Sequence, residues 1–211
     1  MNVKILSSPK DVLKDFVDRQ IEQDAIIIDT ETTGLINPGV CEISLIDLQG
    51  NILLDTLVKP RVSMSHEARE IHGISDQQLD SAPFIEEVFI ENKDLFRRPM
   101  IAWNWLFDRT ALFGSLQTWV KTISDKEKEK YPNPKGECFM RPYSALYGEY
   151  CDIRKARKRV RLTKAYEDCM EPITQQHRAL SDCQMLKDIF WVIHKKLVDY
   201  KIKEVAEIRS S

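Results

Sequence analysis

Apolar residues recur along the chain with two different spacings, and these spacings predict the order of its helices and strands. Residues 8–22 carry apolar side chains at helical spacing, behind a serine that can cap a helix and a proline that suits its first position. The β-branched run in 25–31 predicts a buried strand. Residues 40–60 predict two more strands, joined by a turn at 49–51.

The rest of the chain predicts mainly helices. A short helix is expected to end at Gly73, because glycine commonly closes helices, and Ser75 with Gln78 forms a capping-box pattern for another. Apolar side chains recur at helical spacing in 83–96. The remaining expected elements are short strands at 99–103 and 138–141, helices at 106–120 and 177–200, and a charged, proline-broken surface loop at 121–137.

This order of elements indicates the fold class. Strands that first form a meander and then alternate with helices predict a mixed sheet covered by helices, an α/β single domain. A chain of 211 residues is long enough for one such domain with a proper core. We expect residues 1–24 to form a helical extension packed on the domain, residues 25–200 to form the domain itself, and residues 201–211 to be a C-terminal tail.

Composition and charge narrow the class of protein. Hydrophobic residues make up 43% and charged residues 30% of the chain, an ordinary balance for a soluble globular protein. No apolar run is long enough to span a membrane, and no secretory signal is evident, so we expect a cytoplasmic protein without a membrane partner. Five scattered cysteines without a C-x-x-C pair predict neither a zinc site nor a disulfide framework. With a net charge of −2, the chain needs a local basic patch to bind a polyanion.

Two acids end the strand predicted at 25–31. Asp29 and Glu31 share one face, because side chains alternate along a strand, and they lie about 6.5 Å apart along the chain. Like charges repel, and each carboxylate costs free energy to desolvate, so a divalent cation between them is the first interpretation. A plain strand-end pair is the alternative, which we disfavour because clusters of like charge usually mark functional sites.

Two further acids stand one turn before the apolar stripes of predicted helices. Asp108 and Asp182 each begin the buried face of their helix near its N-terminus, where the helix dipole favours an anion. Either residue alone would more often be a plain helix-terminal acid, and only the combination with the strand acids reverses that interpretation. Four carboxylates that meet at one place suit two Mg²⁺ or Mn²⁺ ions, whereas zinc prefers histidine and cysteine.

A histidine completes this set of residues. His177 lies five positions before Asp182, and an imidazole beside a metal cluster is a natural general base because it titrates near neutral pH. Taken alone, it would more often be an ordinary surface or capping histidine. Together with the acids it predicts metal-dependent hydrolysis of phosphodiester bonds.

The chain resembles a known family, the DEDDh 3′–5′ exonucleases, which includes the proofreading subunit of the bacterial replicative polymerase and oligoribonuclease. The resemblance covers residues 25 to about 195 and rests on "DTETTG", "NWLFD" and "HRALSD" in that order, with "HGI" and "LTKAYE" at the expected intervals. It implies a ribonuclease H-like α/β/α fold with a five-stranded mixed sheet. It also implies that four acids bind two metal ions and that His177 deprotonates the attacking water; the four acids are Asp29, Glu31, Asp108 and Asp182.

The resemblance also implies a site for the terminal nucleotide. The residues at matching positions are Thr32, Leu35, His72, Asn104 and Phe107. His72 precedes Gly73 and can equally be a residue of a helix C-terminus. Trp103 and Trp105 stand where many relatives carry smaller residues or a histidine, and we expect them to be core anchors rather than stacking platforms for bases.

The function implied by the resemblance is release of nucleoside 5′-monophosphates from single-stranded 3′ ends, with DNA favoured. One alternative is an RNA-trimming 3′–5′ exoribonuclease, and another is a catalytically silent nuclease fold that recruits a protein. A polymerase or another nucleic-acid-processing protein stays open as a partner. Residues 154–164 include seven Lys or Arg, which indicates either a solvated face or contacts with the phosphate backbone.

Overall fold

A five-stranded sheet lies at the centre of the molecule. The computed structural model describes residues 8–172 and 175–210, and the side chains of 201–210 are not described. The strand order is β3-β2-β1-β4-β5. β2 is antiparallel to β1 and β3, whereas β4 and β5 run parallel to β1, so the sheet is mixed as expected. The strands are β1 (Ile26–Thr32), β2 (Val40–Asp47), β3 (Ile52–Leu57), β4 (Met100–Ala102) and β5 (Gly136–Cys138).

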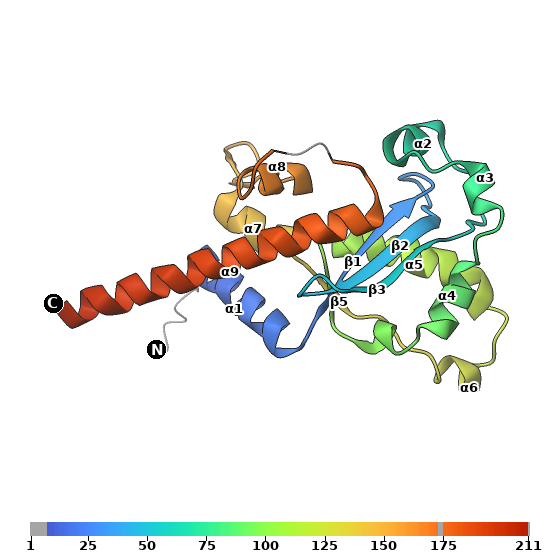
Figure 1. The fold of residues 1–211 in the computed structure, drawn as a ribbon, viewed down its shortest axis with the longest axis horizontal. Coiled ribbons are helices and arrows are strands. Elements are labelled where there is room, and N and C mark those ends of the chain that lie inside the picture. The colour runs from blue at the N-terminus through green and yellow to red at the C-terminus, as the bar shows by residue number, and fades with distance from the viewer. Residues whose placement is uncertain (1–7, 173–174, 211) are drawn as a thin grey trace.

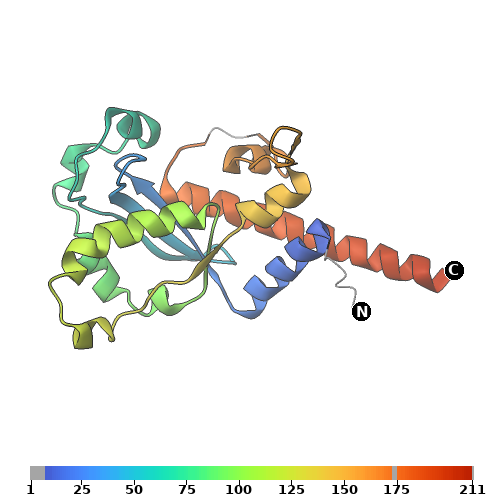
Figure 2. The same cartoon turned by 180° about the vertical axis from the view of Figure 1, so that it is seen from behind.

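Helices cover both faces of this sheet (Figures 1 and 2). The side chain of Ile27 packs into the core on one face, and those of Ile26 and Ile28 pack into the core on the other, as alternation along a strand requires. The expected α/β/α arrangement is therefore confirmed. The first face is covered by α1 (Pro9–Glu22), α7 (Met140–Tyr147), α8 (Leu162–Glu167) and α9 (Ala179–Ser210), the second by α4 (Ile85–Glu91) and α5 (Trp105–Val120).

Short elements connect these layers. The first of these elements is α2 (His66–His72), which ends at Gly73. The φ of Gly73 is +70°, a value that favours glycine, and the capping box of Ser75 and Gln78 is present as expected. None of the helices in the described ranges is long and apolar enough to cross a membrane. The connecting elements are α2 (His66–His72), α3 (Asp76–Leu79), the 3₁₀ turn η1 (Leu95–Arg97), α6 (Asp125–Lys128), and the hairpin strands β6 (Tyr150–Cys151) and β7 (Ala156–Arg157).

Several expected boundaries are wrong. The fifth strand lies at Gly136–Cys138 instead of 138–141, and Met140 already begins α7. β5 can approach α5 because Gly136 lacks a side chain: a Cβ there would lie 2.6 Å from the Trp105 ring. The helix expected at 83–96 ends at Glu91, and the 3₁₀ turn follows it separately.

The last helix also differs from expectation. It begins at Ala179, two residues later than expected, and its backbone continues to Ser210, beyond the expected end at residue 200. α1 packs against α7 and α9, with Leu13 and Val17 fully buried between them and the sheet. Residues 1–7 of the expected extension and residue 211 of the expected tail lie outside the described residues.

Candidate active site

A gap beside β1 receives the N-terminus of α5. Only Ile26 and Ile27 of β1 pair with β4, which stops at Ala102, while β1 continues to Thr32. α5 fills the space beside the second half of β1. There Oδ1 of Asp108 accepts hydrogen bonds from the backbone N–H and the hydroxyl of Thr30, at 3.1 and 2.9 Å. A longer β4 would have accepted the hydrogen bond from the N–H of Thr30. Because β4 ends early, the Asp108 carboxylate accepts this bond instead, which fixes the carboxylate beside the end of β1.

Three of the four predicted metal ligands meet on the α9 side of β1. Each of Asp29, Glu31 and Asp182 offers a carboxylate oxygen, and these oxygens lie within 4.8 Å of one another. Oδ2 of Asp182 accepts a 2.5 Å hydrogen bond from Gln175, but its Oδ1 is buried without a hydrogen-bond partner among the described residues. A carboxylate that lies close to two more acids and has a buried oxygen without a partner fits a hard divalent cation. The fourth acid, Asp108, approaches from the gap and is not part of this close group.

Burial and mutual repulsion make these carboxyl groups hard to ionise in the absence of a cation. Burial, followed by the charges of Asp108 and Asp182, holds the pKa of Asp29 well above its usual range. Burial and then the charge of Asp182 raise the pKa of Glu31 to about 8. Burial also raises the pKa of Asp108 to about 7 and that of Asp182 to about 6. A bound divalent cation would favour the ionised forms of all four.

These shifts predict how stability changes with pH. The pKa of Glu31 is raised from 4.5 to about 8 on folding, so its contribution is fully present below pH 4.5 and is lost as pH rises through about 8. We expect the Glu31→Gln variant, without metal, to melt at a higher temperature than the wild type. This difference should grow from about pH 5 to about pH 8. Thermal melts of both proteins in a chelator measure it.

Added Mg²⁺ or Mn²⁺ provides the control for this experiment. A cation that binds the folded wild type should raise its melting temperature more at about pH 8 than at about pH 5, because it competes with protons for the same carboxylates. A melting-temperature difference between variant and wild type that shrinks with rising pH would contradict the assignment of Glu31 to this cluster.

One residue of the site was missed in the sequence. Glu42 lies opposite Glu31 in the β1–β2 ladder and is 3% exposed. Its carboxylate forms an ion pair with Arg178, whose Nε lies 3.0 Å from both carboxylate oxygens, and Oε2 also accepts a 2.9 Å hydrogen bond from the backbone N–H of Ala179. Glu42 therefore ties the start of α9 to the sheet, one helical turn before Asp182. The signal was a lone acid within the apolar run "VCEISLI".

The Glu42→Ala variant should therefore be less stable. It leaves the N–H of Ala179 and the guanidinium of Arg178 without their acceptor, and we expect the free energy of unfolding to fall by about 2 kcal/mol. Denaturant titrations measure this free energy of unfolding. They are carried out in Mg²⁺, because the cation reduces the repulsion among the neighbouring acids. Glu91→Ala, which removes an exposed acid at the end of α4, is the matched control. A decrease no larger than that of the control would contradict the anchoring role of Glu42.

His177 lies at the entrance to α9. Its backbone has a φ of +47°, an uncommon value for a residue other than glycine, and its side chain is half-buried. The next residue is Arg178, which is held by Glu42, so the position of His177 is fixed from one side. Its imidazole is close enough for its charge to lower the pKa of Asp182 against the effect of burial. His177 thus lies near Asp182, one acid of the cluster.

Three of the five predicted nucleotide-binding residues line one cavity. Thr32, Leu35 and His72 border a space of about 670 Å³ between the loop at 33–39 and α2. The side chain of Leu35 is 85% exposed and free to meet a ligand. His72 is buried, and its Nδ1 accepts a 3.0 Å hydrogen bond from the N–H of Ile74, which supports the helix-terminal alternative.

The other two residues do not line this cavity. Asn104 immediately precedes α5, and Phe107 is half-buried in the first turn of that helix. Trp103 and Trp105 are buried in the cores on opposite faces of the sheet, so their interpretation as core anchors is confirmed.

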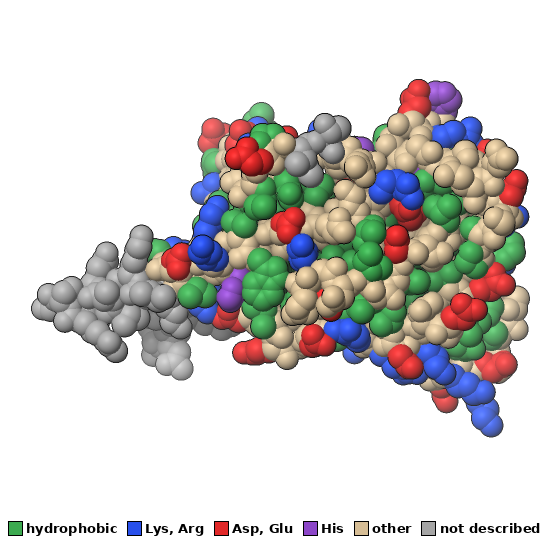
Figure 3. All heavy atoms as spheres, in the orientation of Figure 1, with side chains coloured by type: hydrophobic (Ala, Val, Ile, Leu, Met, Phe, Trp, Pro, Cys, Tyr) green, Lys and Arg blue, Asp and Glu red, His purple; other side chains and the backbone are tan. Residues whose placement is uncertain are grey.

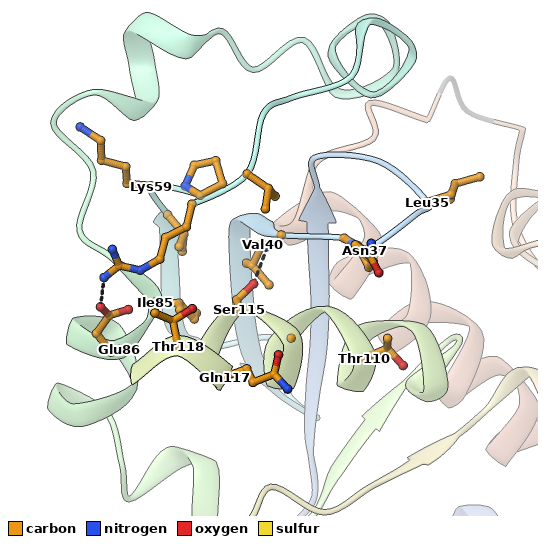
Figure 4. A pocket seen from close by; sticks show the side chains of 17 residues that line it. Leu35, Asn37, Val40, Lys59, Ile85, Glu86, Thr110, Ser115, Gln117 and Thr118 are labelled. Atoms are coloured by element: carbon orange, nitrogen blue, oxygen red, sulfur yellow. Dashed lines mark hydrogen bonds and ion pairs between the residues drawn. The ribbon is translucent and has the colours of Figure 1, made fainter. Parts of the chain in front are cut away.

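A second cavity of about 470 Å³ lies on the far side of the same loop, against α5 (Figure 4). Its two cationic side chains are already engaged: Arg61 forms an ion pair with Glu86, and Lys59 donates a 2.8 Å hydrogen bond to the carbonyl of Asp80. Ser115 accepts a 2.9 Å bond from the N–H of Val40, which closes the inner wall. Both cationic side chains that line this cavity are therefore already bound to other groups of the protein.

Comparison with known proteins identifies the class to which this fold and site belong. A family model described as Exonuclease (RNase_T) matches residues 26–190. The chain is 30% identical over 177 residues to an uncharacterized exonuclease of Escherichia phage 186, covering 83% of this chain and 90% of the phage protein. It is 27% identical over 219 residues to a DNA polymerase III PolC-type of Thermotoga maritima, where it covers 98% of this chain but only 15% of the polymerase.

Solved structures agree with this result. Exonuclease X in complex with 5′ overhanging duplex DNA matches with a TM-score of 0.57 and 24% identity, over 82% of this chain and 92% of that one. A 3′-exonuclease that recognises the 3′ end of a histone mRNA stem-loop matches with a TM-score of 0.62 and 17% identity, over 88% and 72%.

The chain therefore belongs to the exonuclease family, with the ribonuclease H-like fold expected from its sequence. Within it, the chain is a DEDDh 3′–5′ exonuclease, a hydrolase of nucleic acid from a family that generally uses divalent metal ions.

Proposed function

We propose that this protein removes nucleotides one at a time from the 3′ end of single-stranded nucleic acid, with DNA favoured, and releases nucleoside 5′-monophosphates. The observation that carries this proposal is the close group of Asp29, Glu31 and Asp182, in which Asp182 has a buried oxygen without a partner among the described residues. The preference for DNA draws support from the PolC-type polymerases and from exonuclease X bound to duplex DNA. A polymerase partner has no support beyond the PolC likeness.

In this proposal the four acids of the site hold the metal ions. Two Mg²⁺ or Mn²⁺ ions held by Asp29, Glu31, Asp108 and Asp182 would stabilise the attacking and leaving oxygens of an in-line displacement at phosphorus. Thr30 holds one oxygen of Asp108 and leaves the other free to bind. Gln175 holds one oxygen of Asp182 in the same way. Because one oxygen of each carboxylate is already fixed, little reorganisation is needed when the other binds a cation.

In this proposal His177 accepts the proton of the water that attacks the terminal phosphodiester. Its side chain is half-buried and so keeps some contact with solvent. The 3′-terminal nucleoside would lie in the cavity between the loop at 33–39 and α2. Leu35, at the exposed tip of that loop, would contact the terminal base through its apolar side chain.

An RNA substrate is the second candidate, and the likeness to the 3′-exonuclease that recognises an mRNA stem-loop favours it. A protein distinguishes RNA from DNA through contact with the 2′-hydroxyl. The cavity offers hydroxyls of Thr32, Thr33 and Ser65 as hydrogen-bonding groups for that contact.

The test uses matched DNA and RNA oligonucleotides, single- and double-stranded, each labelled at its 5′ end. We expect a ladder of products shortened one nucleotide at a time from the 3′ end, stimulated by Mg²⁺ or Mn²⁺ and abolished by chelator. Faster degradation of RNA than of DNA would favour the second candidate. Binding without cleavage of any oligonucleotide would show a catalytically silent nuclease fold and overturn the proposal.

A further inference from the structure

The hairpin of β6 and β7 carries a concentration of positive charge. Residues 150–161 contain six Lys or Arg and one acid, Asp152. Lys158 pairs with Glu149, and Arg157 donates a 2.6 Å hydrogen bond to the carbonyl of Gly148. The other four cations make no ion pair within the described part of the chain. These four are Arg154, Lys155, Arg159 and Arg161, all exposed.

An apolar side chain stands among these charges. Ile153, in the turn of the hairpin, is 95% exposed, more than any other large hydrophobic residue that the structure describes. Arg154 and Lys155 follow it directly, and Lys155 has a φ of +47° that turns the chain back into β7. A single exposed isoleucine needs no explanation by itself. Next to two cations without ion pairs among the described residues, however, it can pack against a base, as aliphatic side chains do when they wedge between base steps, while the cations bind phosphates.

The stem of the hairpin is fixed on the active-site side of the molecule. The indole N–H of Trp103 donates a 3.2 Å bond to the carbonyl of Val160, and the N–H of Val160 donates a 2.9 Å bond to Ser144. Trp103 lies at the corner between β4 and α5, which leads directly to Asp108. At Gly148 a Cβ would lie 2.3 Å from the carbonyl oxygen of Lys158, so the two ends of the hairpin stem are in close contact.

The position of the hairpin relative to the acid cluster suits a long substrate. α8 follows the hairpin and packs on α9. In Figure 1, α8 and α2 lie on the same side of α9, with the start of α9 between them. On the face that α9 crosses, acidic and basic side chains are interspersed (Figure 3), so that face offers no comparable concentration of one sign among the described residues. The chain as a whole has a charge of −2, and a polyanion must therefore meet a local group of cations.

We infer that the β6–β7 hairpin is a second nucleic-acid contact, which holds the strand several nucleotides upstream of its 3′ end. Arg154, Lys155 and Arg159 bind phosphates, and Ile153 packs against a base. This inference rests on the proposed function. It adds that affinity for substrate depends on strand length, because only a strand that reaches from the acid cluster to the hairpin binds at both places.

The first experiment replaces Arg154, Lys155 and Arg159 together by glutamine. Binding to a long and to a very short single-stranded oligonucleotide is measured over a range of salt concentrations, with Ca²⁺ and an uncleavable terminal linkage. Removing one phosphate-binding cation should reduce the slope of log K against log salt by about 0.7, so the slope of the triple variant should fall by up to about 2. Affinity for the long strand should fall by about 10-fold or more near 0.1 M salt, and affinity for the short one should not change.

A matched triple variant provides the control. Lys121, Lys126 and Lys130 are exposed, make no ion pair with described residues, and lie at the end of α5 and around α6. Their replacement by glutamine changes the net charge equally and should leave the slope unaltered. An unchanged slope in the hairpin variant, or an equal change in both triple variants, would overturn the inference.

Ile153→Ser tests the apolar contact separately. It should weaken binding of the long strand by a similar factor at every salt concentration, because an apolar side chain displaces no counterions from the phosphates. Ile52→Ser, at an exposed position in β3, is the control and should bind like the wild type. Equal binding of Ile153→Ser and wild type would show that Ile153 does not touch the strand and would overturn that part of the inference.

A small substrate separates this inference from the proposed function. All hairpin variants should hydrolyse the nitrophenyl ester of thymidine 5′-monophosphate at the wild-type rate, because this ester cannot reach the hairpin. Failure of the wild type on both ester and oligonucleotide would overturn the proposed function, while the binding experiments would still decide the role of the hairpin. A slower ester reaction in the hairpin variants would show that the substitutions disturb the acid cluster, and it would overturn the separation of the two sites.

Discussion

Replacing Asp29 by asparagine should reduce the rate of metal-dependent cleavage by about 10³-fold or more. Asp29 lies in the close group with Glu31 and Asp182. Burial, together with the neighbouring charges, holds its pKa well above the usual range of an aspartate. Asparagine keeps the shape of the side chain but removes the charge that attracts a cation. The fold should persist, and without metal it should be slightly more stable, because asparagine avoids the cost of burying a carboxyl group among other acids.

Single-turnover rates on a labelled oligonucleotide at saturating Mg²⁺ measure this effect, with thermal melts of the same preparations to show that the variant is folded. Asp15→Asn removes an equal charge from an exposed position on α1 and is expected to cleave at the wild-type rate. Substantial activity of the Asp29→Asn variant under these conditions would refute the metal site as assigned.

The second large effect concerns His177. Its replacement by alanine should lower kcat by about 10²- to 10⁴-fold with little change in KM, because a general base acts on the transition state and not on substrate binding. Activity of the variant should recover in part as pH rises, since hydroxide becomes more abundant when no base is present. His194→Ala, on α9 well beyond the active site, is the control.

These effects are measured by determining kcat and KM as functions of pH for both variants and the wild type. If His177→Ala raised KM and left kcat near the wild-type value, the histidine would bind substrate, and the proton would have to pass to another group.

The sequence located the acids of the site but not all of the interactions that hold them. Asp29 and Glu31 follow from alternation along a strand, and Asp182 follows from its place at the start of an amphipathic helix. The same reasoning put Asp108 on its helix, but only the early end of β4 explains why its carboxylate is bonded to Thr30 inside the sheet. Local periodicity carries no information about where a neighbouring strand stops.

Glu42 and the fifth strand show the same limit in different ways. Glu42 was hidden because its partners, Arg178 and Ala179, are remote in sequence, and a lone acid in an apolar strand has no local partner to reveal it. The position of β5 depends on how closely Gly136 can approach Trp105, which is a question of packing and not of pattern. The position of β5, which depends on tertiary packing, was therefore predicted wrongly.

The tie between Glu42 and the start of α9 has a consequence for the newly synthesised protein. A nascent chain that has emerged only as far as α8 already contains Asp29, Glu31 and Asp108, but neither Asp182 nor the arginine that anchors it. The interactions that complete the acid cluster span more than half of the chain, and such distant interactions form late in folding. We therefore expect a chain that ends after α8 to lack metal-dependent cleavage, because it contains neither Asp182 nor the ion pair that ties α9 to the sheet.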